Sequence, residues 1–528
     1  MKLKIIIAFL CISSASAQIT TEALLDTIQH TAFNYFWYEA NPANGLIKDR
    51  AAVSGTSNAP CSIASVGFGL TAICIGVDHG WVTRVAARDR VLATMKTFWY
   101  GPQGSGNNYI GNFGLFYHFL DMNTAKRTWE SELSTIDTAL LLAGIIDAKQ
   151  YFTGSDSAET QIRGLSDSIY YRMNWNMMRN SNPGIMLGWK PGTGFSGYGQ
   201  WVGYNEATIM YILALGSPTH PVDYSAWQKW TEGYNGNLKN QYGYYYVNFP
   251  PLFGHQYSHC WIDFRNSADD WMKARNLNYF ENSRRATLAQ QAYAVANPGA
   301  FVGYSDSLWG ITASDSPTGY KARGAPPAQD DDGTVTPTAP ISSIPFAPEA
   351  VLPVIHKMWN TYGSQLWTKY GFRDAFNLSV SPAWWDTDVI GIDQGPIIIM
   401  IENYRNQSVW NRFMQNSDVQ RGLAAAKFST ITEVKKQDRL PKEFSLKQNY
   451  PNPFNPTTEI RYQMSAVSHV TLTAYDILGK EIASLVDEVQ EAGNYTVKFN
   501  GSHFTAGVYF VRMNAGRFSK TIKVLLVK

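Results

Sequence analysis

The hydrophobic positions between about residues 20 and 415 recur mostly with the spacing of helices. In the segment 24–36, apolar side chains lie three or four positions apart, which places them on one face of a helix. The segments 63–75 and 136–151 are apolar on most sides, as expected of helices that are buried all round. The same periodicity predicts further helices at 157–173, 205–215, 222–232, 286–296, 348–361 and 387–404. Clear strands are few and no repeat of fixed period is visible, so the pattern predicts an all-α toroid whose long loops build a site at one end.

The hydrophobic period changes to two near the C-terminus. Three runs alternate apolar and polar residues, at 470–475, 495–499 and 508–512, and glycines lie between them. Short alternating runs at close intervals predict a small antiparallel β-sandwich over residues 441–528. The polar segment 418–440 is predicted to be a linker between this domain and the helical domain, residues 18–417.

The first residues have the pattern of an export signal. Lys2 and Lys4 precede an apolar stretch at 5–12, and small residues at 15–17 form a cleavage site. We therefore expect a signal peptide over residues 1–17. No later stretch is apolar for the ~20 residues that a membrane-spanning helix needs, so the exported protein is expected to have no membrane span.

The composition narrows the class of partner. A net charge of +2 over 528 residues provides no strong field for nucleic acid or acidic lipid, so neither is an expected partner. Aromatic residues make up 14% of the chain and include 17 Trp, while charged residues make up only 16%. Aromatic faces can pack against the apolar C–H surfaces of sugar rings, so this balance indicates a carbohydrate groove as well as an aromatic core. Beyond the signal, the odd number of cysteines (Cys61, Cys74 and Cys260) favours buried free thiols over a disulfide.

The candidate metal motifs are weak, and no metal or cofactor is predicted. His255 and His259 have the four-residue spacing of a zinc site on a helix, but Gln256 stands where a zinc protease has its catalytic Glu. A structural or sugar-binding role is favoured for both histidines. The acidic run 330–332 could bind calcium, but a solvated acidic turn is the favoured interpretation.

Carboxylates in weakly charged, aromatic surroundings are the stronger candidates. Cleavage of a glycosidic bond needs one protonated acid at the leaving oxygen and one carboxylate that activates water or attacks carbon. Apolar walls raise the pKa of such an acid. Five carboxylates qualify by their surroundings: Glu132, Asp137, Glu206, Asp263 and Asp393. For each one, the alternative is a charge at a helix N-terminus or a buried ion pair.

The C-terminal region resembles the type A sorting domain of type IX secretion substrates. The resemblance is carried by the segments 444–446 (FSL), 448–456 (QNYPNPFNP), 475–479 (YDILG) and 506–509 (AGVY). It implies that the type IX secretion machinery is a partner and that the protein passes through the periplasm to become secreted or attached to the outer cell surface. A carbohydrate-binding sandwich is the weaker alternative, because no strand face carries an obvious row of aromatic residues.

The helical region resembles the bacterial glucoamylase-like domain, which includes glycoside hydrolase family 144, the bacterial endo-β-1,2-glucanases. The matching segments, in order, are 62–70 (SIASVGFGL), 114–120 (GLFYHFL), 132–138 (ELSTIDT), 204–207 (YNEA), 251–258 (PLFGHQYS), 309–313 (WGITA) and 392–396 (IDQGP). The resemblance implies an (α/α)6 barrel that hydrolyses β-1,2-glucan in endo fashion, inverts the anomeric centre and needs no cofactor.

The same resemblance assigns roles to residues. Glu206 matches the acidic residue of the family's Tyr-Asn-Glu motif and is the proposed general acid. Asp393 is the first choice for the base and Asp137 the second, and an inverting pair is expected ~6.5–9.5 Å apart, or farther if a water or a substrate hydroxyl relays the proton. The residues expected to bind substrate along the groove are Glu132, Trp201, Tyr204, His255, Tyr257, Trp261, Asp263 and Arg265.

Three alternatives remain open at this point. The enzyme could act on another glucan linkage, or it could release disaccharides from chain ends. The chain could also be a surface glucan-binding protein with a decayed site, although every candidate carboxylate is still present. The protein is expected to be a monomer whose partner is a glucan polysaccharide or oligosaccharide.

Overall fold

The structure is a computed structural model that describes residues 19–431, 443–465, 468–490, 493–516 and 518–528. The predicted signal peptide, residues 1–17, lies outside the described residues, as do residues 432–440 of the predicted linker. No described helix is both long and apolar enough to cross a membrane.

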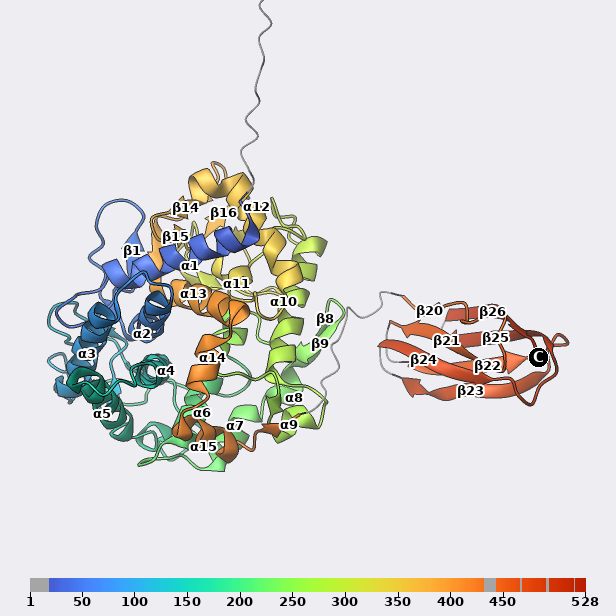
Figure 1. The fold of residues 1–528 in the computed structure, drawn as a ribbon, viewed down its shortest axis with the longest axis horizontal. Coiled ribbons are helices and arrows are strands. Elements are labelled where there is room, and N and C mark those ends of the chain that lie inside the picture. The colour runs from blue at the N-terminus through green and yellow to red at the C-terminus, as the bar shows by residue number, and fades with distance from the viewer. Residues whose placement is uncertain (1–18, 432–442, 466–467, 491–492, 517) are drawn as a thin grey trace, which may run out of the picture.

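The helices of residues 19–431 form a ring of outer and inner segments that alternate along the chain (Figure 1). The outer helices are α1 (Thr21–Tyr38), α3 (Arg84–Tyr100), α5 (Ser157–Tyr171), α7 (Tyr224–Thr231), α10 (Tyr279–Ala296) and α12 (Pro348–Leu366). The inner segments are α2 (Ile63–Asp78), α4 (Thr135–Tyr151), α6 (Thr208–Gly216), the 3-10 turns η2 (Leu252–His255) and η3 (Tyr257–Cys260), α11 (Thr338–Ile341) and α13 (Gly391–Arg405). This is the predicted α/α toroid.

The inner and outer helices differ in how much of their surface is buried. Every residue of α6 is buried, and so are 63–76 of α2. Outer helices such as α5 and α7 bury one face and expose the other. The two segments that the sequence marked as buried all round, 63–75 and 136–151, are both inner helices, because an inner helix has no polar face to mark its period.

Some boundaries differ from the prediction. Helix α3 was not predicted, although its buried residues recur at helical spacing from Ala87 to Phe98. Helix α10 begins at Tyr279 rather than 286, because Asn278 caps it by accepting a hydrogen bond from the Glu281 N–H. The helix expected from 387 begins at Gly391, since the preceding residues pair with another strand.

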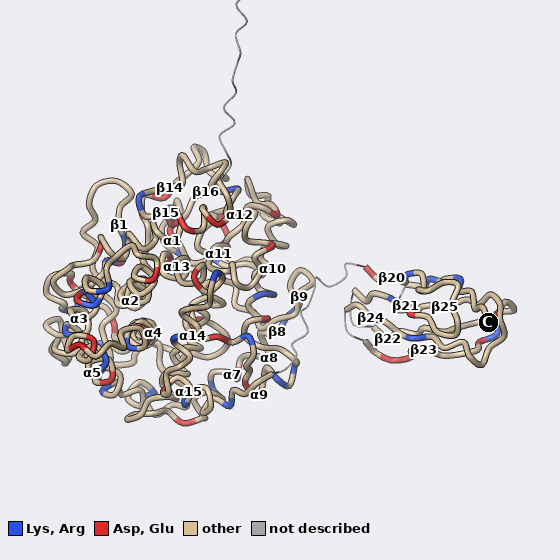
Figure 2. The backbone as a smooth tube through the Cα atoms, viewed as in Figure 1, with Lys and Arg blue, Asp and Glu red and all other residues tan. Residues whose placement is uncertain are grey.

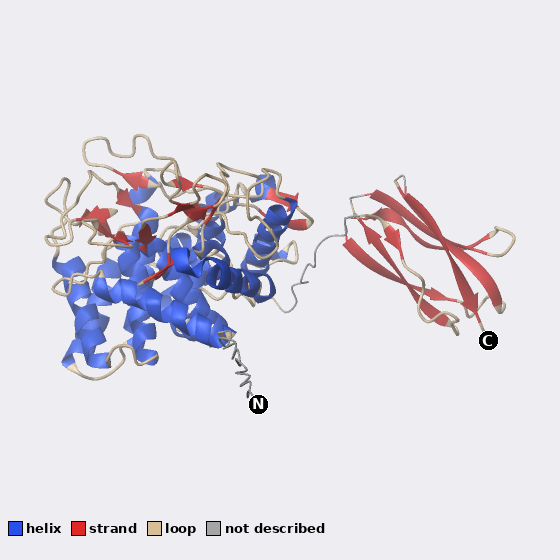
Figure 3. Ribbon diagram, turned by 90° about the horizontal axis from the view of Figure 1, so that it is seen from above, coloured by secondary structure: helices blue, strands red, loops and turns tan. Residues whose placement is uncertain are grey.

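Short antiparallel ladders connect the loops, and most of them lie with the loops on one side of the helices (Figure 3). The pairs are β1 (Arg50–Ala52) with β18 (Asp388–Ile390), β2 (Cys61–Ser62) with β5 (Phe119–Leu120), β3 (Gly111–Asn112) with β4 (Leu115–Phe116), β6 (Leu133–Ser134) with β7 (Gly188–Trp189), β8 (Leu238–Gln241) with β9 (Tyr244–Val247), β10 (Ser267–Ala268) with β19 (Ser429–Thr430), β11 (Ala313–Ser314) with β12 (Lys321–Ala322), and β14 (Trp367–Thr368) with β15 (Gly371–Phe372). One three-stranded sheet has the order β13 (Thr334–Val335), β16 (Phe376–Asn377), β17 (Trp384–Trp385). Ladders of two to four residues carry almost no alternation, so the sequence showed few strands here.

The helical part continues beyond residue 417, where the linker was predicted to begin. Helix α14 (Ser408–Phe413) contacts α4 and α13, and α15 (Ser417–Ala425) packs on α6. Strand β19 then pairs with β10. Residues 418–431 are therefore folded against the toroid, and only the later part of the predicted linker remains a candidate for that role. The remaining short helices are η1 (Met177–Arg179), α8 (Tyr234–Asn237) and α9 (Asp270–Lys273).

The C-terminal residues form two antiparallel sheets, as the alternating pattern predicted. One sheet has the order β20 (Ser445–Leu446), β21 (Thr457–Met464), β24 (Gly493–Asn500), and the other has the order β23 (Glu481–Gln490), β22 (Ser468–Tyr475), β25 (Gly507–Ala515), β26 (Phe518–Leu526). Their shared core includes Leu446, Ile460, Leu472, Val511 and Val524. Basic and acidic positions are interspersed over both parts of the chain (Figure 2).

Two features of the core follow from small or unpaired side chains. Cys61, Cys74 and Cys260 are free and buried, as predicted. Helices α2 and α4 approach closely at Gly67 and Gly144, where a Cβ on Gly144 would lie 1.9 Å from the Gly67 carbonyl oxygen. The close contact of these two inner helices therefore requires glycine.

Gly144→Ala tests this contact. The added methyl group meets backbone, which cannot rotate away, so we expect the variant to lose about 1–3 kcal/mol of stability and to unfold at a lower temperature in a thermal melt of the full chain. The matched control is Gly164→Ala in the outer helix α5, where a Cβ meets nothing within 4 Å. That change should instead gain about 0.5–1 kcal/mol. Equal midpoints for the two variants would contradict the close-contact interpretation.

Candidate active site

A cavity of about 470 Å³ opens at the loop end of the toroid. Its apolar wall comes from Phe119, Trp129, Ile136, Leu140, Phe253, Tyr257, Ala313, Tyr320, Ile390 and Ile392. Its polar groups are Asp49, Arg50, Ser62, His118, Asp137 and Glu206. Two predicted catalytic carboxylates, Asp137 and Glu206, therefore lie in one aromatic cavity.

Four inner helices present their N-terminal ends to this cavity. Ser62 is the N-cap of α2, Asp137 lies in the first turn of α4, and Glu206 lies just before α6. Ile392 lies in the first turn of α13. The alternation of outer and inner helices makes the inner ones run in one direction, and this brings residues distant in sequence to the same end.

Hydrogen bonds to the main chain fix the position of Glu206, whereas its carboxyl has few partners. The Ser258 hydroxyl donates to the Glu206 carbonyl oxygen at 2.9 Å, and the Asn205 side chain accepts from the Ala207 N–H. The Glu206 Oε2 atom is buried and has no hydrogen-bond partner among the described residues. Burial, together with the charge of Asp137, raises the pKa of Glu206 to about 7. The carboxyl can therefore carry a proton at neutral pH.

Asp137 belongs to a chain of charged groups. The Ser134 side chain caps α4 by accepting from the Asp137 N–H and donates its hydroxyl proton to the Asp137 carboxylate. His118 lies between two carboxylates, with Nε2 3.5 Å from Asp137 Oδ2 and Nδ1 2.9 Å from Glu132 Oε1. Burial lowers the pKa of His118, but the two carboxylates outweigh it and raise that pKa to about 9. At neutral pH, Asp137 therefore faces an imidazolium.

Asp393 is buried behind the cavity wall and does not line the cavity. Its carboxyl shares a hydrogen bond with the Asp374 carboxyl, and burial raises its pKa to about 7 even though that hydrogen bond opposes the rise. The charges of both Asp393 and Glu206 act on the buried Tyr257 hydroxyl and, after burial, contribute to raising its pKa. Tyr257 therefore lies close to both carboxyls.

The sequence did not single out Asp49 and Arg50. Arg50, in β1, contacts Asp49 at 3.1 Å, Asp315 at 2.8 Å and Asp388 at 3.3 Å. Asp49 directly precedes Arg50, but Asp315 and Asp388 are distant from it along the chain, so no sequence spacing connects those two to Arg50. His118 was also missed as a site residue, although it lies inside the matching segment 114–120 and could have been found there.

Seven of the eight residues expected along the groove do not line the cavity, and three of them are aromatic. Trp201 donates its indole N–H to Thr135 Oγ1 at 3.0 Å. Tyr204 is buried with its ring centroid 4.7 Å from that of His255. Trp261 is fully buried, and its N–H donates to Thr71 Oγ1 at 2.9 Å. These aromatic side chains are packed beneath the loops, because the residues that flank the cavity motifs also supply the core.

His255 is likewise a core residue. Neither of its ring nitrogens has a hydrogen-bond partner within the described ranges, and burial lowers its pKa to about 3. The Nε2 atom of His259 is 3.1 Å from Ser283 Oγ, and burial lowers its pKa to about 3 as well. Both histidines are therefore neutral at physiological pH, and the structural interpretation fits them.

Asp263 and Arg265 form an ion pair instead of a groove wall. Their side chains approach to 2.7 Å, and the Arg265 guanidinium lies 4.6 Å from the ring centroid of Trp410. Asp263 lines a separate surface pocket with Trp410. Of the predicted substrate-binding residues, Tyr257 lines the cavity, and Glu132 reaches it only through His118.

A second cavity, of about 760 Å³, adjoins the first through Trp129, which lines both. Trp129 is 65% exposed, and Tyr38 in the second cavity is 69% exposed. The two cavities are therefore neighbours at Trp129, and each has an exposed aromatic side chain in its lining.

An α/α toroid with a proton-bearing carboxyl beside a carboxylate, in a groove of aromatic side chains, defines a glycoside hydrolase. The comparisons with known proteins agree. Residues 198–417 match the family described as "Putative glucoamylase". A crystal structure from Bacteroides uniformis, described in the same words, is 33% identical with a TM-score of 0.72 and covers 78% of this chain and 98% of its own. The chain belongs to this glucoamylase-like family, which is related to the β-1,2-glucanases.

Two further relatives have more specific descriptions. An endo-β-1,2-glucanase from Chitinophaga pinensis, solved with sophorotriose and glucose, is 27% identical with a TM-score of 0.71, over 78% of this chain and 99% of its own. A curated relative from Parabacteroides distasonis, an exo β-1,2-glucooligosaccharide sophorohydrolase acting at the non-reducing end, is 30% identical over 442 residues, which are 78% of this chain. The match spans 59% of that relative's length.

Residues 448–528 match the family described as "Secretion system C-terminal sorting domain". The β-domain is therefore a sorting domain, as the sequence indicated, and it implies secretion or delivery to the outer cell surface.

Proposed function

We propose that the protein hydrolyses β-1,2-glucans and that it cuts within the chain. The observation that carries the hydrolytic role is Glu206, a buried carboxyl with a raised pKa that shares an aromatic cavity with Asp137. The linkage is supported by the similarity to the Chitinophaga pinensis and Parabacteroides distasonis enzymes.

The groove supports the endo mode. An enzyme that recognises a chain end needs a wall that stops the polymer beyond the terminal sugars. Here Trp129, which lines the cavity that holds Glu206, also lines a second, larger cavity. Because Trp129 is exposed to both, its ring can stack on a sugar of a chain that crosses from one cavity to the other.

Glu206 is the proposed general acid. A general acid must hold a proton at the working pH and then release it to the leaving oxygen. Burial gives the Glu206 carboxyl this property, since the apolar wall disfavours its charged form.

Asp393 is the proposed base, and Asp137 is the alternative. Asp137 has the better position, because it lines the cavity. However, its carboxylate already accepts the Ser134 hydroxyl proton and lies beside His118, so other groups engage its oxygens. Asp393 has a raised pKa, and the Tyr257 hydroxyl interacts electrostatically with both Asp393 and Glu206, so a relayed proton could connect Asp393 to the water that attacks carbon. The mechanism we propose inverts the anomeric centre, as the family resemblance implies.

The substrate and mode are tested by incubating the protein with linear β-1,2-glucan, starch, laminarin and cellulose and separating the products. We expect mixed short oligomers from β-1,2-glucan alone. Trp129→Ala should raise KM for long β-1,2-glucan more than for short sophoro-oligosaccharides, because only long chains reach the second cavity. Tyr100→Ala, which removes an equally exposed aromatic ring, is the control.

Other product patterns would change the conclusion. Sophorose as the sole early product would mean that the enzyme acts from chain ends. Glucose from starch would refute the linkage, and retained binding without any release would make the protein a glucan-binding protein.

Glu206→Gln should lower kcat by ~10²–10⁴-fold, the usual contribution of general acid catalysis. The control is Glu232→Gln, a side chain in an exposed ion pair. Because the pKa of Glu206 is raised to about 7, its carboxyl is protonated below that pH and loses its proton above it. The wild-type kcat/KM should therefore fall as the pH rises through about 7. A Gln variant with near-normal activity would remove Glu206 from the mechanism.

The base is identified by comparing Asp393→Ala with Asp137→Ala. The variant without the base should lose ~10²–10⁴-fold in kcat, and sodium azide should restore its turnover, because azide attacks without needing deprotonation. We expect rescue of Asp393→Ala, with the α-anomer formed first by the wild-type enzyme in NMR. Rescue of Asp137→Ala alone would assign the base to Asp137, and an initial β-anomer would overturn inversion.

A further inference from the structure

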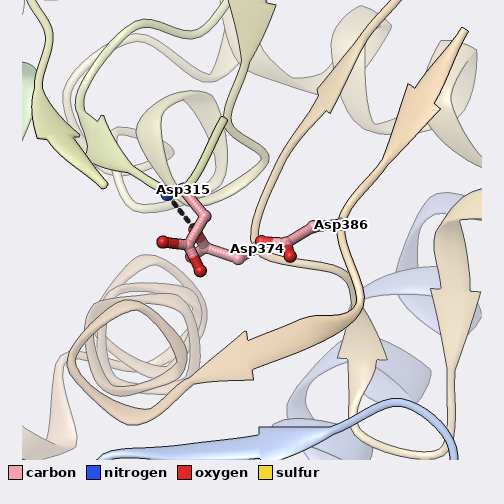
Figure 4. A group of neighbouring side chains, drawn as sticks. All are labelled: Asp315, Asp374 and Asp386. Atoms are coloured by element: carbon pink, nitrogen blue, oxygen red, sulfur yellow. Dashed lines mark hydrogen bonds between the residues drawn. The ribbon is translucent and has the colours of Figure 1, made fainter. Parts of the chain in front are cut away.

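Three aspartates outside the cavity lining converge on the loop side of the toroid (Figure 4). Asp315 follows β11, Asp374 lies between β15 and β16, and Asp386 lies between β17 and β18. One carboxylate oxygen from each lies within 4.8 Å of the others. Asp374 and Asp386 are each only 3% exposed.

Each buried carboxylate accepts a main-chain N–H through one of its oxygens. Asp374 Oδ2 accepts the Asp315 N–H at 2.9 Å, and Asp386 Oδ1 accepts the Asp388 N–H at 3.2 Å. The Asp374 carboxyl also shares a hydrogen bond with the Asp393 carboxyl, whereas Asp386 Oδ2 is buried without a hydrogen-bond partner among the residues that the structure describes. Buried polar oxygens of native proteins are normally satisfied, so this oxygen, in a side chain grouped with those of Asp315 and Asp374, indicates a missing ligand.

The negative charge here also exceeds the positive charge. Arg50 is the basic side chain that reaches the group, and it is shared among Asp315, Asp388 and Asp49. Arg373, the nearest arginine in sequence to Asp374, donates to the main-chain oxygens of Gln365 and Asp386 and not to a carboxylate. Within the described ranges, no ion pair to Asp374 or Asp386 is present.

The chemistry of the donors selects the kind of ligand. All three side chains offer carboxylate oxygen, and neither nitrogen nor sulfur is available from them. Such a set suits hard cations, and calcium accepts six to eight oxygens in flexible geometry, including main-chain oxygens and waters. Ligands drawn from three separate loops fit calcium better than magnesium, which demands a near-ideal octahedron.

We propose that Asp315, Asp374 and Asp386 bind a calcium ion that ties together the loops around the active site. The β11–β12 hairpin carries Tyr320, which lines the cavity. The β17–β18 connection leads directly into α13. The cation thus joins a wall of the cavity to the base of α13, and its binding does not depend on which glucan is cleaved. Sequence spacing did not reveal this site, because Asp315 lies on a loop that is distant along the chain from those of Asp374 and Asp386.

Protonation of the aspartates is the alternative to a bound cation for neutralising their negative charge. Burial raises the pKa of Asp386 to about 8, so this carboxyl can be neutral when no cation is bound. Asn has the shape of the neutral acid, and we therefore expect Asp386→Asn and Asp374→Asn to fold without calcium.

The test uses the full exported chain, stripped with EGTA. Terbium should bind with one site per chain and luminesce when indole is excited, since Trp385 is adjacent to Asp386. Calcium should displace terbium and raise the temperature of unfolding. Asp386→Asn and Asp374→Asn should each bind calcium at least tenfold more weakly and lose the thermal shift. Asp330→Asn, in the neighbouring acidic run, is the matched control and should bind as the wild type does.

The outcomes separate this proposal from the proposed function. Unchanged calcium binding in Asp386→Asn and Asp374→Asn, or no thermal shift in the wild type at millimolar calcium, would overturn the site. Loss of binding in Asp330→Asn alone would move the site to the acidic run and also overturn it. Hydrolysis of β-1,2-glucan by a protein that binds no calcium would leave the proposed function intact.

Discussion

The active site depends on one constraint of the toroid, which is that its inner helices all begin at the same end. Outer and inner segments alternate along the chain, so each inner helix returns in the same direction. Asp137, Glu206 and Asp393 therefore lie at the starts of three different helices and come together although the chain separates them widely. The close approach of α2 and α4 at Gly67 and Gly144 holds this end of the ring in place.

The ionisation of these carboxyls results from two opposing effects. A helix N-terminus favours a carboxylate through its unpaired N–H groups, whereas burial in an apolar wall favours the neutral acid. Burial wins at Glu206, whose pKa rises to about 7. Asp137 instead has a capping serine and the His118 imidazolium beside it. The two carboxyls therefore lie in one cavity but in different surroundings. Such a difference in surroundings allows one carboxyl to act as an acid while the other stays charged.

The loops that complete the cavity have little regular structure of their own. Their ladders are mostly two or three residues long, and their polar contacts run between loops, as with Arg50 and its three aspartates. Ion pairs between these segments therefore help to hold the loops in place, in addition to the few backbone hydrogen bonds of their ladders. The shape of the groove on both sides of Trp129 follows from how these loops are held.

The sequence by itself determined the class of each domain. Continuous apolar runs such as 63–75 marked inner helices, alternating runs such as 470–475 marked the β-domain, and motif order indicated the family. It also selected Glu206 and Asp137, because family motifs record residues near the chemistry. Only the tertiary structure decided which neighbours reach the cavity. Trp261 and His255 are core residues, Asp263 pairs with Arg265, and α15 extends the toroid past residue 417. Arg50, His118 and the group around Asp374 emerged only in three dimensions, because ion pairs and cavity walls join residues whose distance along the chain carries no information about their distance in space.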